Sequence, residues 1–128
     1  TYVNDSKCTT VEALKVALAS FDAPVVLLAG GKFKGGDLKA MSQLLEQHVK
    51  AVALYGASRN HFETAWSGIV PLSWDETLDL ALHRAQGIAS KGDTILLAPA
   101  TASYDQYSNY IERGEHFKSL VYAMGGQR

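Results

Sequence analysis

Three segments of the sequence hold residues whose types and spacing suit recognition of an anionic ligand. The first segment, residues 4–10, reads Asn-Asp-Ser-Lys-Cys-Thr-Thr and leads into a helical pattern. The free N–H groups at the start of a helix attract an anion, and Lys7 adds a full positive charge beside them. A simple capping loop with a solvated Lys7 explains the same spacing, and both interpretations stand.

The second segment, residues 30–37, reads Gly-Gly-Lys-Phe-Lys-Gly-Gly-Asp, with four glycines and two lysines in eight residues. Glycines let the backbone approach a ligand closely, and the lysines supply positive charge. The spacing and the missing final Ser or Thr exclude a Walker A loop. A surface loop with solvated lysines is the alternative.

The third segment, residues 99–117, begins with small residues and continues with tyrosines and amides, which predicts a pocket wall. The alternative is an ordinary turn from strand to helix, covered by tyrosines. The histidines show no metal-binding spacing with one another or with Cys8, so we expect no metal site in this chain.

Apolar runs and amphipathic stretches alternate along the chain and must position these segments. Continuous apolar runs predict strands buried on both faces at residues 25–29, 51–55 and 94–98. Residues 69–72 form a shorter run, in which Pro71 indicates an edge or strand-end position, and residues 2–3 are a candidate further strand. Helical periodicity predicts helices over residues 11–21, 38–49, 78–88 and 117–124.

Capping-box spacings at Thr9–Glu12 and Ser73–Glu76 mark two expected helix starts. The order of elements predicts an α/β fold, a Rossmann-like and mostly parallel sheet of about six strands with helices on both faces. Ligands bind beyond the carboxyl ends of such strands. The three segments are therefore expected to meet at one edge of the sheet.

Composition excludes several classes of protein. The 128 residues predict one domain, and 47% apolar residues are typical of a globular chain. The net charge of -1 argues against non-specific nucleic-acid binding, and no apolar run is long enough to span a membrane. The single cysteine suits a reducing compartment, and no signal peptide is evident. A start at Thr1 without an initiator Met is interpreted as a domain of a longer protein or a processed chain.

The motifs together resemble the C-terminal domain of the Mur ligases. They read Asn-Asp-Ser-Lys at 4–7, Gly-Gly-x-x-Lys-Gly-x-Asp at 30–37 and Ala-x-Ala-Ser-x-Asp-Gln-x-x-Asn-Tyr-x-x-Arg-Gly-x-x-Phe at 100–117. They occur in the family's order and span nearly the whole chain. Within the family, the sequence is most similar to the D-glutamate-adding member.

The resemblance implies one part of a three-domain enzyme. The other two domains would bind the UDP-sugar and hold ATP with Mg²⁺, and this chain, which lacks a P-loop, resembles only the third. The implied reaction is ATP-dependent amide ligation of D-glutamate to UDP-N-acetylmuramoyl-L-alanine through an acyl phosphate, in cytoplasmic peptidoglycan precursor synthesis. The isolated domain is expected to be an inactive monomer.

The resemblance also assigns residues to D-glutamate. Lys34 is implied as the clamp for a carboxylate, with Thr9 and Ser103 as hydroxyl donors. Tyr104 is implied as a backbone donor, and Tyr110 as an aromatic neighbour of the side-chain carboxylate. A dicarboxylate requires several donors and at least one cation, which agrees with this set.

Asp5 and Lys7 are implied to contact the ribose and phosphates of ATP, with Lys7 acting in catalysis as the domain closes. Lys32 is a second cation in the glycine-rich segment, so either Lys32 or Lys34 is the carboxylate clamp. Two alternatives to the preferred function remain. One is another Mur or folylpolyglutamate-type ligase, and the other is a stand-alone module for a small anion or nucleotide.

Overall fold

The computed structural model describes residues 2–6, 10–21, 24–31, 37–98 and 109–123. Within these residues, five parallel strands form one sheet in the order β1-β5-β2-β3-β4. The elements are, in chain order, β1 (Tyr2–Asn4), α1 (Val11–Ala19), β2 (Val25–Gly30), the 3₁₀ helix η1 (Leu38–Met41), α2 (Ser42–His48), β3 (Val49–Tyr55), α3 (Arg59–Trp66), β4 (Leu72–Asp75), α4 (Leu78–Ile88), β5 (Thr94–Leu97) and α5 (Tyr110–Ala123).

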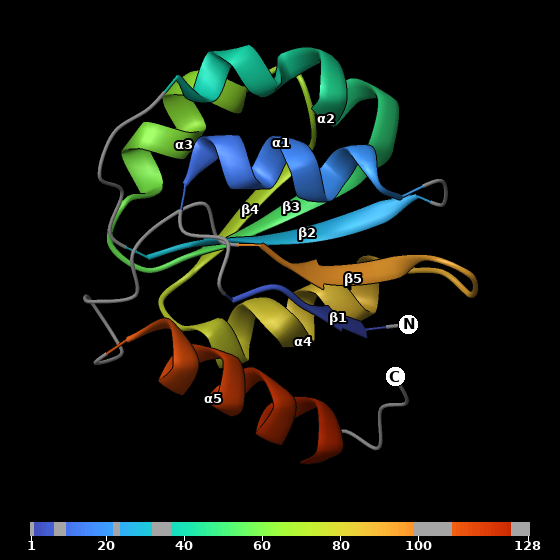
Figure 1. The fold of residues 1–128 in the computed structure, drawn as a ribbon, viewed down its shortest axis with the longest axis vertical. Coiled ribbons are helices and arrows are strands. Elements are labelled where there is room, and N and C mark those ends of the chain that lie inside the picture. The colour runs from blue at the N-terminus through green and yellow to red at the C-terminus, as the bar shows by residue number, and fades with distance from the viewer. Residues whose placement is uncertain (1, 7–9, 22–23, 32–36, 99–108, 124–128) are drawn as a thin grey trace.

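Helices cover both faces of the sheet, as the sequence predicts (Figure 1). Successive strand residues point to opposite faces. Val25 and Leu27 therefore pack under α1, α2 and α3, whereas Val26 and Leu28 pack against α4 and α5. All four side chains are fully buried, which explains why β2 is a continuous apolar run.

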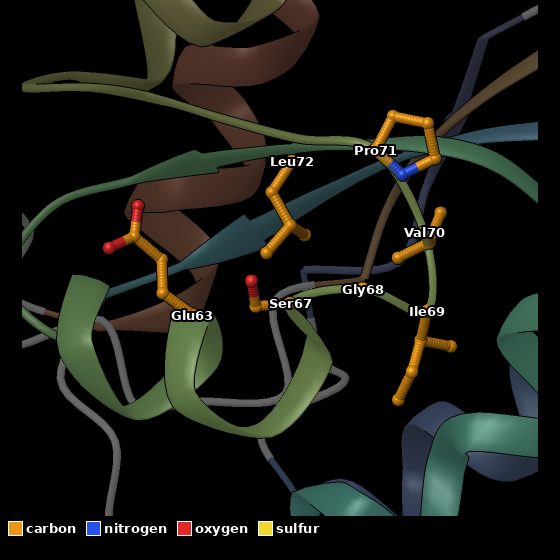
Figure 2. A pocket seen from close by; sticks show the side chains of 7 residues that line it. All are labelled: Glu63, Ser67, Gly68, Ile69, Val70, Pro71 and Leu72. Atoms are coloured by element: carbon orange, nitrogen blue, oxygen red, sulfur yellow. The ribbon is translucent and has the colours of Figure 1, made fainter.

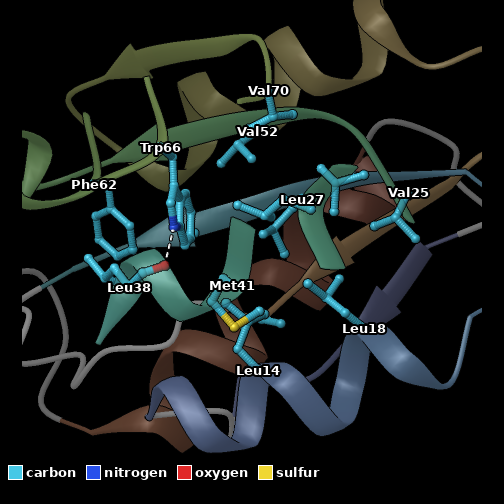
Figure 3. Packing of buried hydrophobic residues seen from close by; sticks show 14 of the residues in the cluster. Leu14, Leu18, Val25, Leu27, Leu38, Met41, Val52, Phe62, Trp66 and Val70 are labelled. Carbon is cyan, nitrogen blue, oxygen red and sulfur yellow. Dashed lines mark hydrogen bonds between the residues drawn. The ribbon is translucent and has the colours of Figure 1, made fainter. Parts of the chain in front are cut away.

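Trp66, at the end of α3, is buried in the apolar core between the sheet and the helices α1, α2 and α3 (Figure 3). Its indole Nε1 donates a hydrogen bond of 2.8 Å to the carbonyl of Leu38. Its ring lies 5.0 Å from that of Phe62, at an angle of 59°. The hydrogen bond satisfies a buried indole and joins η1 to α3.

The predicted strands at 2–3, 25–29 and 51–55 are confirmed with longer bounds, and the strand at 94–98 ends one residue earlier, at Leu97. The strand predicted at 69–72 is shifted along the chain, because β4 begins only at Leu72. Pro71 immediately precedes β4, which is an edge strand, and Tyr2–Asn4 is the opposite edge. The described residues form five strands, close to the expected number of about six.

The helix start predicted at Ser73 is wrong. Ser73 lies within β4 and pairs with Ala53, because Leu72 and Trp74 alternate with polar residues at the period of a strand. The helix that follows, α4, is capped by Thr77, whose side chain accepts a hydrogen bond from the backbone of Leu80.

Other helices also differ from prediction. The helix predicted over 11–21 ends at Ala19, and the one predicted over 38–49 is divided into η1 and α2. The cap of α1 is Thr10, which accepts a bond from Ala13 N at 3.1 Å, and Thr9 lies outside the described residues. Helix α3 was not predicted, because Phe62 and Trp66 are its only buried residues.

Helix α5 begins at Tyr110 rather than at Phe117. Its buried face includes Arg113 and Gly114, which hide the apolar period over the first turns. Asn109 caps the helix by accepting a 2.9 Å bond from the backbone of Glu112. In the described part of the chain, no helix has the length and apolar character needed to cross a bilayer.

Candidate functional site

The carboxyl ends of all five strands lie at the same edge of the sheet, because every described strand pair is parallel. Neighbouring strands β1 and β5 precede helices on opposite faces, α1 on one and α5 on the other. Chains that diverge in this way leave a crevice at the strand ends, where ligands bind in open α/β sheets. The candidate site is therefore the carboxyl end of β1 beside the start of α5.

Backbone and amide hydrogen bonds fix the end of β1. Asp5 N donates to Leu97 O at 2.8 Å, which extends the ladder between β1 and β5 by one step. Asn4 uses both ends of its amide: its Oδ1 accepts from Ser6 N at 3.2 Å, and its Nδ2 donates to Gly114 O at 3.1 Å. The segment is thus bound both to the sheet and to α5.

Arg113 is a fully buried charged residue that points from α5 into this segment. Its Nε donates to Ser6 Oγ at 2.9 Å, and its Nη2 donates to Ser6 O at 2.7 Å. The Ser6 hydroxyl in turn donates to the carbonyl of Tyr110 at 2.6 Å. Burial of a guanidinium is costly unless it is hydrogen-bonded, so these contacts hold the segment and the helix in one arrangement.

Gly114 allows α5 to approach β1 closely. A Cβ at this position would lie 3.2 Å from the Cβ of Ser6 and 3.3 Å from Nδ2 of Asn4. Those distances are tighter than ordinary van der Waals contact. A larger residue would displace the helix from the strand end and lengthen the bonds of Arg113.

A hollow of about 260 Å³ opens at the junction of these two segments. It is lined by Asn4, Asp5 and Ser6 from the end of β1, and by Tyr110, Ile111, Gly114, Glu115 and Lys118 from α5. Carboxylates, a cation and an aromatic ring therefore surround one small space. The Nζ atom of Lys118 lies 3.7 Å from Oε1 of Glu115, so this carboxylate balances part of the charge of Lys118 within α5.

The end of β2 supplies a second part of the same edge. Gly31 has a φ of 104° and donates to Tyr55 O at 3.2 Å. A Cβ on Gly30 would overlap that same carbonyl. Glycine is thus required where β2 leaves the sheet and the glycine-rich segment begins.

The structure brings two of the predicted site residues together. Asp5, expected on the ATP side, and Tyr110, expected on the D-glutamate side, line the same hollow. Tyr110 is partly exposed, and Asp5 is half-buried. The other predicted site residues lie outside the described residues: Lys7, Thr9, Lys34, Ser103 and Tyr104, together with the alternative clamp Lys32.

Sequence reasoning assigned no role to Ser6 or Arg113, although both stand inside the recognised motifs. An arginine on a helix is usually solvated, and its burial depends on a partner 107 residues away. The available signal was the pairing of Arg113 with Gly114, since glycine is unfavourable within a helix unless close packing requires it.

Among the described residues, two further hollows have linings that do not include Asp5 or Tyr110. Figure 2 shows the larger, of about 660 Å³, where the end of α3 and the connection to β4 surround it. It lies at the amino end of β4, whereas the candidate site is at the carboxyl ends. The second, of about 410 Å³, lies between η1 and α3 and includes Asp37, Lys39 and His61.

An ion pair at the carboxyl end of β4 joins that strand to α4. Arg84 binds Asp75 through two bonds, Nε to Oδ2 at 2.7 Å and Nη2 to Oδ1 at 3.0 Å. This hydrogen bonding and the charge of Asp75 raise the pKa of Arg84 above its usual value. Over the described residues, no group of three or more His, Cys, Asp and Glu side chains could hold a metal ion.

Comparison with known proteins gives close relatives along nearly the whole chain. No family model matches. The chain is 56% identical over 121 residues to the UDP-N-acetylmuramoylalanine–D-glutamate ligase of Lawsonia intracellularis, and 58% identical over 120 residues to that of Nitratidesulfovibrio vulgaris. It is 54% identical over 127 residues to that of Oleidesulfovibrio alaskensis. These matches cover 94–99% of this chain but only 28% of each relative.

Proposed function

This chain is a domain of the Mur ligase family, and from that premise we propose that it is the amino-acid-adding domain of a D-glutamate ligase. The full enzyme would join D-glutamate to UDP-N-acetylmuramoyl-L-alanine in an ATP-dependent reaction that passes through an acyl phosphate. The observation that carries this proposal is the identity of 54–58% along 94–99% of the chain to relatives with that name. The full enzyme would be a monomer that catalyses this reaction in the cytoplasm.

The geometry of the hollow supports this function. The proposal places Asp5 toward the nucleotide and Tyr110 toward D-glutamate, and these two residues line one space of about 260 Å³. A ligase needs its phosphorylated carboxylate and its amine side by side, because the bond forms between them. A single junction that presents a residue to each substrate side suits that requirement.

The remaining proposed contacts come from segments outside the described residues. Lys34, or its neighbour Lys32, would bind a carboxylate of D-glutamate, with Thr9, Ser103 and the backbone of Tyr104 as further donors. A dianionic ligand favours such charge-assisted hydrogen bonds. Gly30 and Gly31 support this assignment, because they place the start of the lysine-bearing segment at the same edge of the sheet.

Lys7 would interact with the phosphates of ATP once this domain closes over the nucleotide. Lys7 directly follows Ser6, whose position is fixed by Arg113. Its charge would stabilise the transition state, and exclusion of water would protect the acyl phosphate from hydrolysis. Mg²⁺ would be held by another domain of the full-length enzyme.

A competition assay on the full-length enzyme tests this function. The enzyme is given UDP-N-acetylmuramoyl-L-alanine, ATP, Mg²⁺ and an equimolar mixture of D-glutamate, L-glutamate, D-aspartate and L-lysine, and the product is identified by mass. The expected product carries D-glutamate alone. Preferential addition of another amino acid would favour a different member of the family. Nucleotide binding without any ligation would favour a stand-alone binding module.

A further inference from the structure

We propose that Ser6 is a positioning residue that couples the two substrate sides of this domain. The inference rests on the proposed function and adds to it a residue that acts through its neighbours. Ser6 belongs to the segment that carries Asp5, and its side chain forms hydrogen bonds with two residues, Arg113 and Tyr110, of the helix on the other side of the hollow. Neither substrate needs to touch Ser6 for its hydroxyl to affect both.

The hydroxyl of Ser6 acts both as an acceptor and as a donor of hydrogen bonds. The hydroxyl accepts from Arg113 Nε at 2.9 Å and donates to Tyr110 O at 2.6 Å. It therefore uses its single donor on the helix start and one acceptor on the buried guanidinium. Because Ser6 is only 5% exposed, water is poorly placed to replace either bond.

The backbone of Ser6 is held as firmly as its side chain. Its N–H donates to Asn4 Oδ1, and its carbonyl accepts from Arg113 Nη2 at 2.7 Å. Asn4 in turn donates to Gly114 O, so the strand end and the helix are linked on both sides of Ser6. A displacement of either element would therefore strain the bonds of Ser6 together with the bond between Asn4 and Gly114.

The coupling follows from where these elements lead. Asp5 directly precedes Ser6, and the proposed nucleotide residue Lys7 directly follows it. Tyr110, whose carbonyl Ser6 binds, lies at the start of α5 and lines the hollow with Asp5. Loss of the hydroxyl would let the two sides of the hollow shift independently, so both substrates would lose affinity together.

The test uses the full-length enzyme with two variants of Ser6. Ser6→Ala removes the hydroxyl, and Ser6→Cys keeps nearly the same volume but provides only a weak donor and acceptor. Ser42→Ala is the matched control, because its hydroxyl donates a similarly short bond, of 2.7 Å, to Lys39 O in η1, and Ser42 does not line the hollow. The readouts are kcat, the KM for D-glutamate, the KM for ATP, and thermal melts.

Both Ser6 variants are expected to raise both KM values by about ten- to a hundredfold, the range for loss of a hydrogen bond to a charged group. Ser42→Ala should leave both KM values at the wild-type level. A purely structural role of Ser6 would lower the melting temperature and leave both KM values unchanged, and an effect on only one KM would also overturn the proposal. If Ser6→Ala fails to fold, Ser6→Cys decides between these outcomes.

The wild-type enzyme separates this inference from the function on which it rests. If it adds D-glutamate while the Ser6 variants match it in both KM values, the coupling role fails and the proposed function stands. If the wild-type enzyme forms no D-glutamate product, the proposed function itself fails. Kinetics of the Ser6 variants therefore test the coupling role, and product formation by the wild-type enzyme tests the proposed function.

Discussion

At the scale of single residues, the two lysines of the glycine-rich segment allow a direct comparison. In the full-length enzyme, Lys34→Ala is expected to raise the KM for D-glutamate by about one to two decades, because it removes a charged hydrogen bond worth roughly 1.5–3 kcal/mol. The KM for ATP should change less. Lys32→Ala is the matched control, and a larger effect from Lys32→Ala would make Lys32 the carboxylate clamp. Steady-state kinetics with each substrate varied in turn provide the measurement.

Gly30 offers a second test at this scale. Gly30→Ala places a Cβ against the carbonyl of Tyr55, so we expect it to destabilise the domain by more than about 1 kcal/mol. Gly87→Ala is the control, since a Cβ there meets nothing within 4 Å and the position is helical. Alanine at Gly87 should stabilise the domain by roughly 0.5–1 kcal/mol. Urea denaturation of both variants checks the pair, and equal stabilities would contradict the close approach of β2 to β3.

The sequence predicts some residues of the candidate site and misses others. Asp5 and Tyr110 stand in recognisable motifs, and both line the same hollow. Ser6 and Arg113 were missed as a pair, because their contact joins segments 107 residues apart. A pattern read along the chain carries residue types and local spacing. It does not carry the long-range packing that buries an arginine.

At the scale of elements, Asp93 holds the turn before β5 to the start of β3. Its Oδ2 accepts from Ser90 N at 2.8 Å and from Lys50 Nζ at 2.9 Å. The backbone hydrogen bond, followed by the bond and charge of Lys50, lowers the pKa of Asp93 below its ordinary value of 3.8. A carboxyl with a lowered folded-state pKa contributes stability that is complete above the ordinary pKa and is lost as pH falls through the folded-state value.

Asp93→Asn should therefore be less stable than wild type at neutral pH, and this difference should shrink as pH falls below about 4. Lys50→Met should reproduce only part of the loss, because the backbone hydrogen bond from Ser90 N remains and is the larger cause of the shift. Urea denaturation at a series of pH values gives the comparison. A stability difference that grew on acidification would contradict the lowered pKa.

The elements also differ in how well their sequences predict them. Strands β2, β3 and β5 are buried on both faces, so their apolar runs are unmistakable. Helices α3 and α5 are harder to predict, since α3 buries two residues and α5 buries a charge and a glycine on its inner face. Periodicity fails where hydrogen bonds or close backbone approach replace apolar contact.

At the scale of the whole molecule, topology determines where chemistry can occur. The five parallel strands of the described residues place their carboxyl ends at one edge, and the strand order puts β5 between β1 and β2. Residues near both ends of the chain, Asp5 and Tyr110, thereby reach one hollow. Alternating strands and helices predicted the fold class. The neighbours of each strand became known only from the structure, because strand order depends on which crossover packs best.

The last prediction concerns the chain as an independent unit. Two apolar cores, one on each face of the sheet, enclose fully buried residues such as Leu27 and Leu28, so the 128-residue chain should fold cooperatively on its own. It should release no ADP from ATP, with or without the proposed substrates, because the sequence contains no Walker A loop. A cooperative urea transition and a coupled ADP assay measure the two properties. The control is the full-length enzyme under the same conditions, which should release ADP only with its substrates. ADP release by the purified domain that is lost in Lys7→Ala would show a complete nucleotide site within these residues and contradict its assignment to another domain.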